Sequence, residues 1–404
     1  IINCMLTKVT LQNFFSFGKA TTIELNPGVN LLIGINASGK SNFLKALQLL
    51  KVGVVEQGLQ ELIKSWGGWE RVGNYGAEKR DSTKLTYEFD FEEIGTFKYT
   101  ISFGMITDIV SDYTFYILNE ELLLKENSAD NWLDVIDIKI DGNNYTITGK
   151  IRKEFGLSNE VFSYTESRVD TLELMLGQNN WYNPYIIGKL YNSIESMHNY
   201  HYFDTSSSSI IRQAKPSGSD RYLFSDGSNL NNVFHHIKNE DLEAYRLIKK
   251  EIKNINQRFE DLDMDIDNDG KHYLTFVEDK LRKPISIAHI SDGTLYYLIL
   301  MVVFYNSKRG EALSLDEPER GLHPDMIHSI SRAIKHAAAD GTQLFIATHS
   351  PLLLNDFEIE DVIIFEKDSD NQTCIKTAED FEDANSDYLL GQLWLNGEIG
   401  GKRW

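Results

Sequence analysis

Cysteine is scarce in this sequence of 404 residues, which contains only Cys4 and Cys374, far apart in the chain. Two distant cysteines exclude a scaffold stapled by several disulfides. They also lack the number and spacing of a cysteine-ligated metal centre. Free thiols are typical of reducing compartments, so we expect the protein to be cytoplasmic.

Long apolar segments are also lacking. The first residues do not form a basic, then apolar, then small-residue leader, so we expect no signal peptide. The longest apolar run, LYYLILMVVFY at 295–305, has about half of the roughly 20 residues that a bilayer span requires. We therefore expect this run to be a buried helix or strand, and we expect no membrane partner.

Positive charge is in deficit, with 40 Lys and Arg against 60 Asp and Glu and a net charge of −20. This balance disfavours non-specific adhesion to nucleic acid or to anionic membranes. A local basic face can still bind DNA phosphates, and the candidates are GKIRK (149–153), RLIKKEIK (246–253) and DKLRK (279–283). Such charged runs more often belong only to a solvated surface, but they leave DNA as a possible partner.

A glycine-rich motif, GINASGKS at 34–41, has the spacing G-x-x-x-x-G-K-[ST] of a phosphate-binding loop. Gly34 and Gly39 would allow backbone N–H groups to turn toward phosphate oxygens without a Cβ in the way. Lys40 is then expected to reach the β- and γ-phosphates, and Ser41 to bind Mg²⁺.

The residues around the motif fit this interpretation. GVNLLIG before the motif predicts a buried strand, and NFLKALQLL after it has apolar residues at the spacing of one helical face. The motif should therefore lie at a helix N-terminus, where the helix dipole favours anions.

Alternating segments after this helix predict antiparallel hairpins. KLTYEFDF (84–91) and TFKYTISFG (96–104) flank an EEIG turn, and VIDIKIDGNNYTITGKI (135–151) contains a second turn. Further along, DMDIDNDG resembles the start of a calcium loop, but the twelfth position is Phe276 where a glutamate is required. We therefore predict an Asp-Gly hairpin turn there instead.

The C-terminal third provides a second group of polar residues at predicted strand ends. EALSLDE predicts a strand that ends at Asp316 and Glu317, and TQLFIATHS predicts another that ends near His349, with a helical pattern between them. This strand–helix–strand order is typical of a parallel α/β sheet, which binds ligands at the carboxyl ends of its strands. Ser291, Asp292 and Gly293, just before the long apolar run, could form a second anion site at a helix start.

Taken in order, these motifs resemble an ABC-type ATPase head. GINASGKS is similar to its Walker A loop, ISDGT to its signature, LSLDE to its Walker B strand, GLHP to its D-loop, and His349 to its switch histidine. Within this class, the chain resembles the RecF, SMC and OLD-like branch. The motifs LQNFFSF, DEPERGLHP and ATHSPLLL most closely resemble those of the small AAA-type ATPases of bacterial anti-phage and toxin–antitoxin operons.

The resemblance implies ATP and Mg²⁺ as cofactors, and two copies of the chain that enclose two ATP molecules. Glu317 and His349 would be catalytic, and Ser41 and Asp316 would hold the metal. The nucleotide-binding residues implied are Gly34, Asn36, Ala37, Ser38, Gly39, Lys40, Ser41 and Asn42, with Ser291, Asp292 and Gly293 of the partner copy.

Two features depart from the family pattern. The N-F-x-S-F element usually has a basic residue at x, and here it is Phe15. The glutamine loop is not identifiable, and Gln57, Gln60 or a later residue could provide it.

The implied fold is α/β: a P-loop head with a parallel core sheet, an antiparallel β subdomain and an inserted helical subdomain. We expect residues 1–83 and 286–404 to form the two halves of the head, 84–154 the antiparallel subdomain, and 155–285 a helical insertion. The roles of 155–200 and of LLGQLWLNGEIGGKRW at the end are not predicted.

The expected function is a homo-oligomeric ATPase that controls a separately encoded nuclease or toxin. The segment between the two halves of the head lacks sustained heptads, and few residues follow His349, so we expect neither long coiled-coil arms nor an appended nuclease domain. The alternatives are a RecF-like ATPase that acts directly on DNA and a scaffold that is locked by nucleotide with little turnover.

Overall fold

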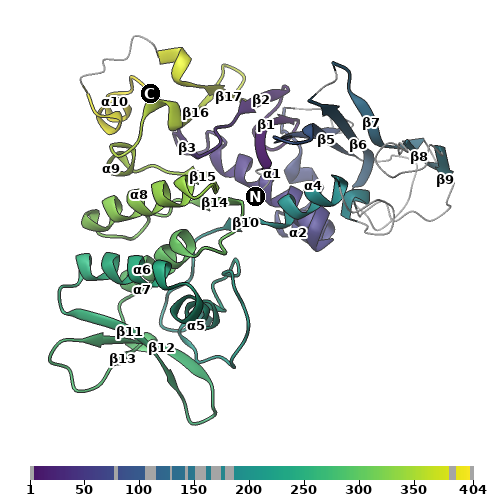
Figure 1. Ribbon diagram of the computed structural model, residues 1–404. Helices are drawn as coiled ribbons and strands as arrows, with labels where there is room; N and C mark the ends of the chain where they lie inside the picture. Colours follow the sequence, from purple (N-terminus) through teal and green to yellow (C-terminus); the bar gives the residue numbers. More distant parts are fainter. Residues whose placement is uncertain are drawn as a thin grey trace.

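The computed structural model describes residues 4–76, 81–104, 115–127, 130–141, 144–150, 161–164, 174–177, 186–381 and 388–400. Within this part of the chain the strands form three sheets, and helices cover the two faces of the sheet at the centre of the molecule (Figure 1). The predicted α/β class is confirmed.

The central sheet is mainly parallel. Among the described residues it has six strands, in the order β10 (Met197–Tyr200), β14 (Ala312–Asp316), β15 (Gln343–Ala347), β3 (Val29–Gly34), β16 (Val362–Lys367) and β17 (Thr373–Lys376). All neighbours are parallel except β16 and β17. The carboxyl ends of β3, β14 and β15 therefore lie at one edge, which is where the sequence placed its polar residues.

Side chains alternate strictly between the two faces of this sheet, and both faces are buried. In β15, Leu344 and Ile346 join one hydrophobic cluster, whereas Phe345 and Ala347 join the other. A sheet covered on both sides favours apolar residues at most positions, which explains the nearly continuous apolar runs in the sequence, although Asn30, Ser314 and Gln343 are buried polar residues within them.

One helix on each face explains the two clusters. The apolar side of α1 (Lys40–Lys51) packs through Phe43 against Phe345 and Phe365, with ring centroids 6.0 and 6.1 Å apart. The apolar side of α8 (Pro324–Ala339) covers the opposite face. The helix α1 follows β3 after a short loop, residues 35–39, and packs on the sheet that positions it.

A second sheet is antiparallel. Its described strands are ordered β2 (Thr21–Glu24), β1 (Cys4–Gln12), β4 (Thr83–Phe91), β5 (Gly95–Gly104), β6 (Tyr116–Glu126), β7 (Leu133–Asp141), β8 (Asn144–Lys150) and β9 (Val161–Tyr164). The pairs β4–β5 and β7–β8 confirm the two predicted hairpins. This sheet packs on α1, where the Tyr87 hydroxyl donates a hydrogen bond of 2.7 Å to the Ala46 carbonyl.

The boundary expected between residues 83 and 84 falls at the start of β4. Because β4 pairs with β1, strands from both sides of that boundary share one sheet. The division of the chain into four parts stays a prediction.

A third group of described elements forms the lobe that carries the apolar run. They include the hairpin β11 (Phe259–Ile266) and β12 (His272–Glu278), the short β13 (Ile285–Ser286), and α5 (Leu230–Glu240) and α6 (Leu242–Ile255). The Asp-Gly turn predicted in place of a calcium loop connects β11 to β12.

The shorter helices of the described chain are α2 (Leu59–Ser65), α3 (Trp69–Val72), α4 (Ile186–Glu195), α9 (Pro351–Leu354) and α10 (Leu390–Asn396).

The segment 155–285, expected to be a helical insertion that includes one Asp-Gly hairpin, combines helices and strands among its described residues. Besides α4, α5 and α6 it contributes β10 to the edge of the central sheet and the β11–β12 hairpin. A strand of four residues is too short to show an alternating pattern, so the sequence did not indicate β10. Much of 155–200 lies outside the described residues, as does part of the basic segment 149–153.

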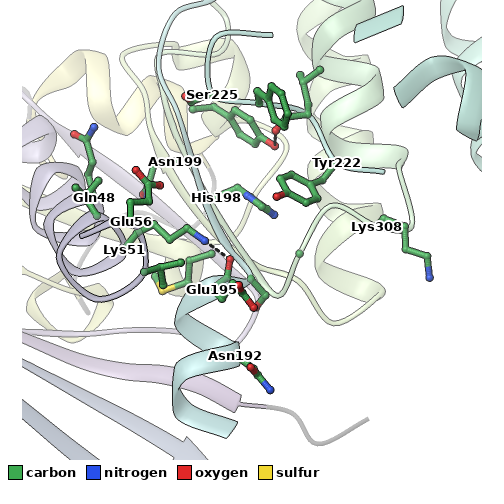
Figure 2. Close-up of a pocket in the computed structure, with 18 residues that line it drawn as sticks. Gln48, Lys51, Glu56, Asn192, Glu195, His198, Asn199, Tyr222, Ser225 and Lys308 are labelled. Carbon is green, nitrogen blue, oxygen red and sulfur yellow. Dashed lines mark hydrogen bonds between the residues drawn. The ribbon is translucent and has the colours of Figure 1, made fainter. Parts of the chain in front are cut away.

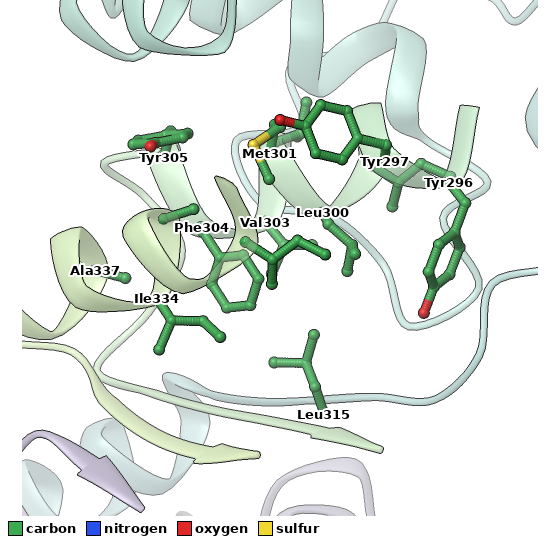
Figure 3. Close-up of a cluster of buried hydrophobic side chains, with 14 of the residues drawn as sticks. Tyr296, Tyr297, Leu300, Met301, Val303, Phe304, Tyr305, Leu315, Ile334 and Ala337 are labelled. Atoms are coloured by element: carbon green, nitrogen blue, oxygen red, sulfur yellow. The ribbon is translucent and has the colours of Figure 1, made fainter. Parts of the chain in front are cut away.

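The apolar run forms α7 (Asp292–Tyr305), a helix with buried side chains on all sides from Leu295 to Tyr305. Figure 3 shows Phe304 and Leu300 lying between α7 and its neighbours, near Ile334 of α8 and Leu315 of β14. A helix that is apolar all round must be enclosed by protein or lipid. No helix in the described ranges combines the length and apolarity needed to cross a bilayer.

The C-terminal segment is partly explained by packing. Leu393, Trp394 and Ile399 are buried in the same cluster as α7, and Asn355 after α9 accepts a hydrogen bond from the Gly391 N–H. Residues 401–404 lie outside the described part.

We predict that Leu300→Ala lowers the free energy of unfolding by about 2–5 kcal/mol, because it removes a fully buried side chain and leaves a cavity. Leu242→Ala is the matched control, since Leu242 is 56% exposed at the start of α6 and its loss should change stability by less than about 1 kcal/mol. Urea denaturation followed by circular dichroism measures both values. Equal effects would contradict the assignment of α7 to the core.

Candidate nucleotide-binding site

The loop between β3 and α1 contains three residues with positive φ: Gly34 at 153°, Ala37 at 64° and Gly39 at 119°. Asn36 and Ala37 form its exposed tip, whereas Ser38 and Lys40 are buried. The first turn of α1 has neither a side-chain cap nor an acidic residue. Its N–H groups and the positive end of its dipole are therefore available to an anion.

The two glycines of the motif are required for two reasons: their positive φ, and neighbouring atoms that leave no space for a Cβ. A Cβ on Gly34 would lie 2.3 Å from the Phe365 carbonyl oxygen, and one on Gly39 would lie 2.5 Å from Thr373 Oγ1. Ser38 Oγ is buried without a hydrogen-bond partner. An orphaned hydroxyl, a backbone cradle and an uncapped helix start together fit a polyphosphate group.

Lys40 lies inside this loop. Its ammonium donates hydrogen bonds of 2.8 and 3.2 Å to the carbonyls of Gly34 and Ile35. Burial lowers the pKa of Lys40 to about 8, against the opposing effect of Asp316 and Glu317. The desolvated ammonium is therefore poorly compensated by neighbouring charge and well placed to receive a phosphate.

A hydrogen bond of 2.9 Å from Ser41 Oγ to Asp316 Oδ2 joins the phosphate-binding loop to the acidic end of β14. A hydroxyl and a carboxylate at this spacing are two of the oxygen ligands that Mg²⁺ accepts, with water and phosphate completing the set. No group of three or more His, Cys, Asp or Glu in the described part of the chain forms a separate metal cluster.

Glu317 follows Asp316 with φ of 50°, a conformation that costs energy for a residue with a Cβ. Its N–H donates a hydrogen bond of 2.8 Å to the Ala347 carbonyl at the end of β15, which fixes this turn to the neighbouring strand. His349 Nε2 lies 3.7 Å from Glu317 Oε1, and both side chains are partly exposed. The structure thus brings together Gly34, Lys40, Ser41, Asp316, Glu317 and His349 at one sheet edge.

Sequence reasoning missed Glu319, which positions this edge. Its Oε1 accepts hydrogen bonds of 2.6 Å from the Thr348 hydroxyl and 3.1 Å from the His349 N–H, and burial raises the pKa of its carboxyl. The available signal in the sequence was the place of Glu319 in PER, directly after the Walker B motif.

A second set of contacts stabilises the phosphate-binding loop from outside. The sequence did not indicate these contacts. Thr373 Oγ1 donates a hydrogen bond of 2.7 Å to the Ser38 carbonyl and lies 2.7 Å from Ser16 Oγ, which in turn accepts a hydrogen bond of 2.8 Å from Asn42. Ser16 belongs to the NFFSF element. That element therefore contacts the loop through its serine.

Ser291, Asp292 and Gly293 begin α7, and Ser291 caps it by accepting a hydrogen bond of 3.2 Å from the Thr294 N–H. Ser291 and Asp292 are exposed. A Cβ on Gly293 would lie 3.8 Å from the Gly321 carbonyl oxygen, so this helix start lies beside the D-loop-like turn of the same chain. The described contacts do not bring these residues to the phosphate-binding loop of their own chain.

Arg212, another residue that sequence reasoning missed, holds this helix start. Its buried guanidinium donates hydrogen bonds to the carbonyls of Thr205, Ile287 and Ile290 and forms a 2.7 Å ion pair with Asp292. The planar group with five donors satisfies acceptors on two segments at once, 205–206 and 287–292. Nothing local in IIRQAK distinguishes it.

Neither candidate for the glutamine loop reaches this site through a described contact. Gln57 Nε2 donates to the Gly177 carbonyl at 3.2 Å, and Gln60 lies on α2. The choice between them, or a later residue, stays open.

The cavity drawn in Figure 2 is separate from these residues. It has a volume of about 710 Å³ and lies between the C-terminal part of α1, the end of α4 and β10. His198 stacks on Tyr222 with ring centroids 4.7 Å apart, and Lys51 donates a hydrogen bond to the Glu195 carbonyl. Burial, together with Lys51, lowers the pKa of His198 to about 4, so its ring is neutral at pH 7.

The parallel core sheet, the loop before α1 and the acidic strand end define an ABC-type ATPase head of the RecF and SMC kind. Residues 29–355 match the family described as "AAA domain, putative AbiEii toxin, Type IV TA system". The chain belongs to that family.

Curated relatives agree with this class. The chain is 24% identical over 200 residues to the DNA replication and repair protein RecF of Clostridium novyi, a match that covers 48% of this chain and 55% of that protein. It is 44% identical over 48 residues to RecF of Limosilactobacillus reuteri, covering 12% and 13% of the two chains. The chain thus spans about half the length, or less, of the curated relatives it matches.

Two solved structures share the fold. An SMC head bound to the C-terminal winged-helix domain of ScpA aligns with a TM-score of 0.52 at 12% identity, covering 93% of this chain and 99% of the other. The SMC head from Pyrococcus furiosus with an extended coiled coil, bound to the C-terminal domain of ScpA, aligns with a TM-score of 0.51 at 12% identity, covering 93% and 97%.

We predict that Gly39→Ala abolishes detectable binding of ATP while the protein stays folded, because the added Cβ would collide with Thr373 and force the loop open. Gly270→Ala is the matched control. Gly270 also has positive φ, 79°, but nothing lies within 4 Å of its added Cβ. Fluorescence titration with a labelled ATP analogue measures binding, and circular dichroism checks folding. Binding by Gly39→Ala equal to that of the control would contradict the cradle.

Proposed function

We propose that this protein binds and hydrolyses ATP with Mg²⁺ in sites shared by two copies of the chain, and so controls a separately encoded effector. The observation that carries this proposal is the Ser41–Asp316 hydrogen bond, which joins the phosphate-binding loop to the acidic strand end. Glu317 and His349 lie next to that pair. Membership of an ATPase family supports nucleotide use.

In the proposed mechanism, Lys40 and the N–H groups at the start of α1 bind the phosphates. Ser41 and Asp316 would hold Mg²⁺, which neutralises charge on the β- and γ-phosphates when bound. Glu317 orients the attacking water and accepts its proton, because its carboxylate follows the metal-binding carboxylate directly. His349, within 3.7 Å of Glu317, contacts the γ-phosphate from the other side of the site.

The second copy would supply Ser291 and Gly293. These residues are at an exposed helix start that the described contacts do not bring to their own loop, so a neighbouring chain is needed for them to reach a phosphate. Tyr202 beside them is 51% exposed, stacks on Tyr296 at 5.2 Å and lies under the Arg320 guanidinium at 5.4 Å. Exposed aromatic and arginine side chains are enriched in protein interfaces.

ATP would then hold the two copies together, since the γ-phosphate gains donors from both chains, and hydrolysis would release them. Such a cycle can transmit a signal to a bound effector. The family description, which names a putative toxin and a toxin–antitoxin system, supports a role in such a system. We propose that the effector is a toxin or nuclease and that the system acts in defence against phage. The similarity to RecF supports the second candidate, an ATPase that acts directly on DNA.

We predict that Glu317→Gln lowers the rate of ATP hydrolysis at least about 100-fold, because it removes the proton acceptor but keeps the shape of the side chain. The variant should accumulate as an ATP-bound dimer. Steady-state phosphate release and light scattering after size exclusion measure the two effects. Glu260→Gln, on an exposed position of β11, should behave as wild type. Turnover at the wild-type rate in Glu317→Gln would show that the assignment is wrong.

We also predict that an operon neighbour co-purifies with Glu317→Gln in ATP and is lost with Lys40→Met, because only the first variant reaches the ATP-bound state. A chain that associates with no co-expressed operon product in either state would contradict effector control.

If the DNA candidate is correct instead, DNA stimulates phosphate release and the stimulation falls steeply with salt. Negligible phosphate release from the wild-type protein under every condition would favour the nucleotide-locked scaffold.

A further inference from the structure

One face of α1 extends from the phosphate-binding loop along the helix. Ser41 is exposed, and Asn42, Lys45 and Gln48 are half-buried, whereas Phe43, Leu44, Ala46 and Leu47 are buried against the two sheets. Residues four apart in a helix are neighbours on its surface. Lys45 therefore lies one turn beyond Ser41, on the same face.

The loop between β1 and β2 comes to this face at Phe15, the position where a basic residue is usual in the family pattern. Phe15 has φ of 48° and is fixed by a hydrogen bond of 2.6 Å from its N–H to the Val72 carbonyl and one of 2.8 Å from Asn74 to its own carbonyl. The next residue, Ser16, accepts the hydrogen bond from Asn42 on α1. Phe15 is thus held rigidly beside the first turn of α1.

The ammonium of Lys45 lies at this same place. Its Nζ atom is 4.4 Å from the centroid of the Phe15 ring and 5.6 Å from that of Trp66, and the two rings contact each other edge to face at 5.6 Å. Two aromatic faces attract a cation and restrict where a long, flexible side chain can hold it. Lys45 therefore brings a positive charge to the position at which Phe15 lacks one.

This charge is electrostatically connected to the metal side of the site. Burial lowers the pKa of both Lys45 and Lys40, and Asp316, whose carboxylate is hydrogen-bonded to Ser41, opposes that shift in each. Lys40 points into the loop at the Gly34 and Ile35 carbonyls. Lys40 thus lies inside the loop, whereas Lys45 lies one turn along α1, over Phe15 and Trp66.

We propose that Lys45, held by Phe15 and Trp66, is a second cation for the bound triphosphate and supplies from α1 the charge that the family pattern places at position 15. This inference rests on the proposed ATP site and adds a residue to it. A triphosphate carries more negative charge than Lys40 and one divalent ion neutralise, so a further cation strengthens binding. The charge of Lys45 contributes this effect, and the rings position it.

The experiment separates charge from packing by equilibrium binding of a fluorescent, non-hydrolysable ATP analogue with Mg²⁺. Lys45→Met keeps the apolar stem over the rings but removes the charge, so Kd should rise about tenfold and depend less on salt. Lys45→Arg should stay within about threefold of wild type. The double variant Phe15→Lys with Lys45→Met should recover most of the lost affinity, because it returns a cation to the same place.

Lys335→Met is the matched control, since Lys335 lies over the Phe357 ring at 5.1 Å on α8 and its loss should leave Kd unchanged. Thermal unfolding of every variant checks the fold. If Lys45→Met lowers only thermal stability and leaves Kd and its salt dependence unchanged, Lys45 merely packs on the rings and the inference is wrong. Failure of the double variant to recover affinity would also overturn it.

Lys40→Met distinguishes this inference from the proposed function. Loss of binding in Lys40→Met with normal binding in Lys45→Met overturns only the role of Lys45. Normal binding in both variants overturns the ATP site itself.

Discussion

The parallel pairing of β3, β14 and β15 is the constraint on which the candidate site depends. Parallel strands end at the same edge, so residues near position 34, position 316 and position 349 come together although they are far apart in the chain. The Ser41–Asp316 hydrogen bond and the Glu317 N–H to Ala347 carbonyl bond follow from that register. A shift of β14 by one residue would turn Asp316 to the other face and separate it from Ser41.

The start of α7 depends on a different constraint, the enclosure of an apolar helix. Because α7 is buried on all sides, its axis is fixed by α8, α6 and β14, and only its N-terminal end can reach a surface. Arg212 then ties that end, through Asp292, to the carbonyls of Ile287 and Thr205. The exposed Ser291 is therefore presented from a rigid base, which suits the proposed contact with a second copy of the chain.

The sequence predicted those parts of the fold and site that have local patterns. Walker A has a fixed spacing, the α1 and α8 helices have a 3.6-residue period, and the β4–β5 hairpin alternates, and all of these were placed correctly. It missed β10, because MHNY is too short and too polar to show a period. It also missed Arg212, Glu319 and the Ser16–Thr373 pair, since each acts through contacts between segments that only the folded chain brings together. The catalytic and binding roles of the predicted residues stay predictions.

The helix α1 connects these observations, because its two faces do different things. Its apolar face is held by Phe43 between strands of the central sheet, and the Tyr87 hydroxyl fixes the Ala46 carbonyl from the antiparallel sheet. At its far end Lys51 donates to the Glu195 carbonyl beside the cavity. A helix fixed at both ends and along one face cannot move independently of the two sheets. The first turn of α1, which begins the phosphate-binding loop's helix, is therefore packed through one rigid element to the central sheet, the antiparallel sheet and the wall of that cavity.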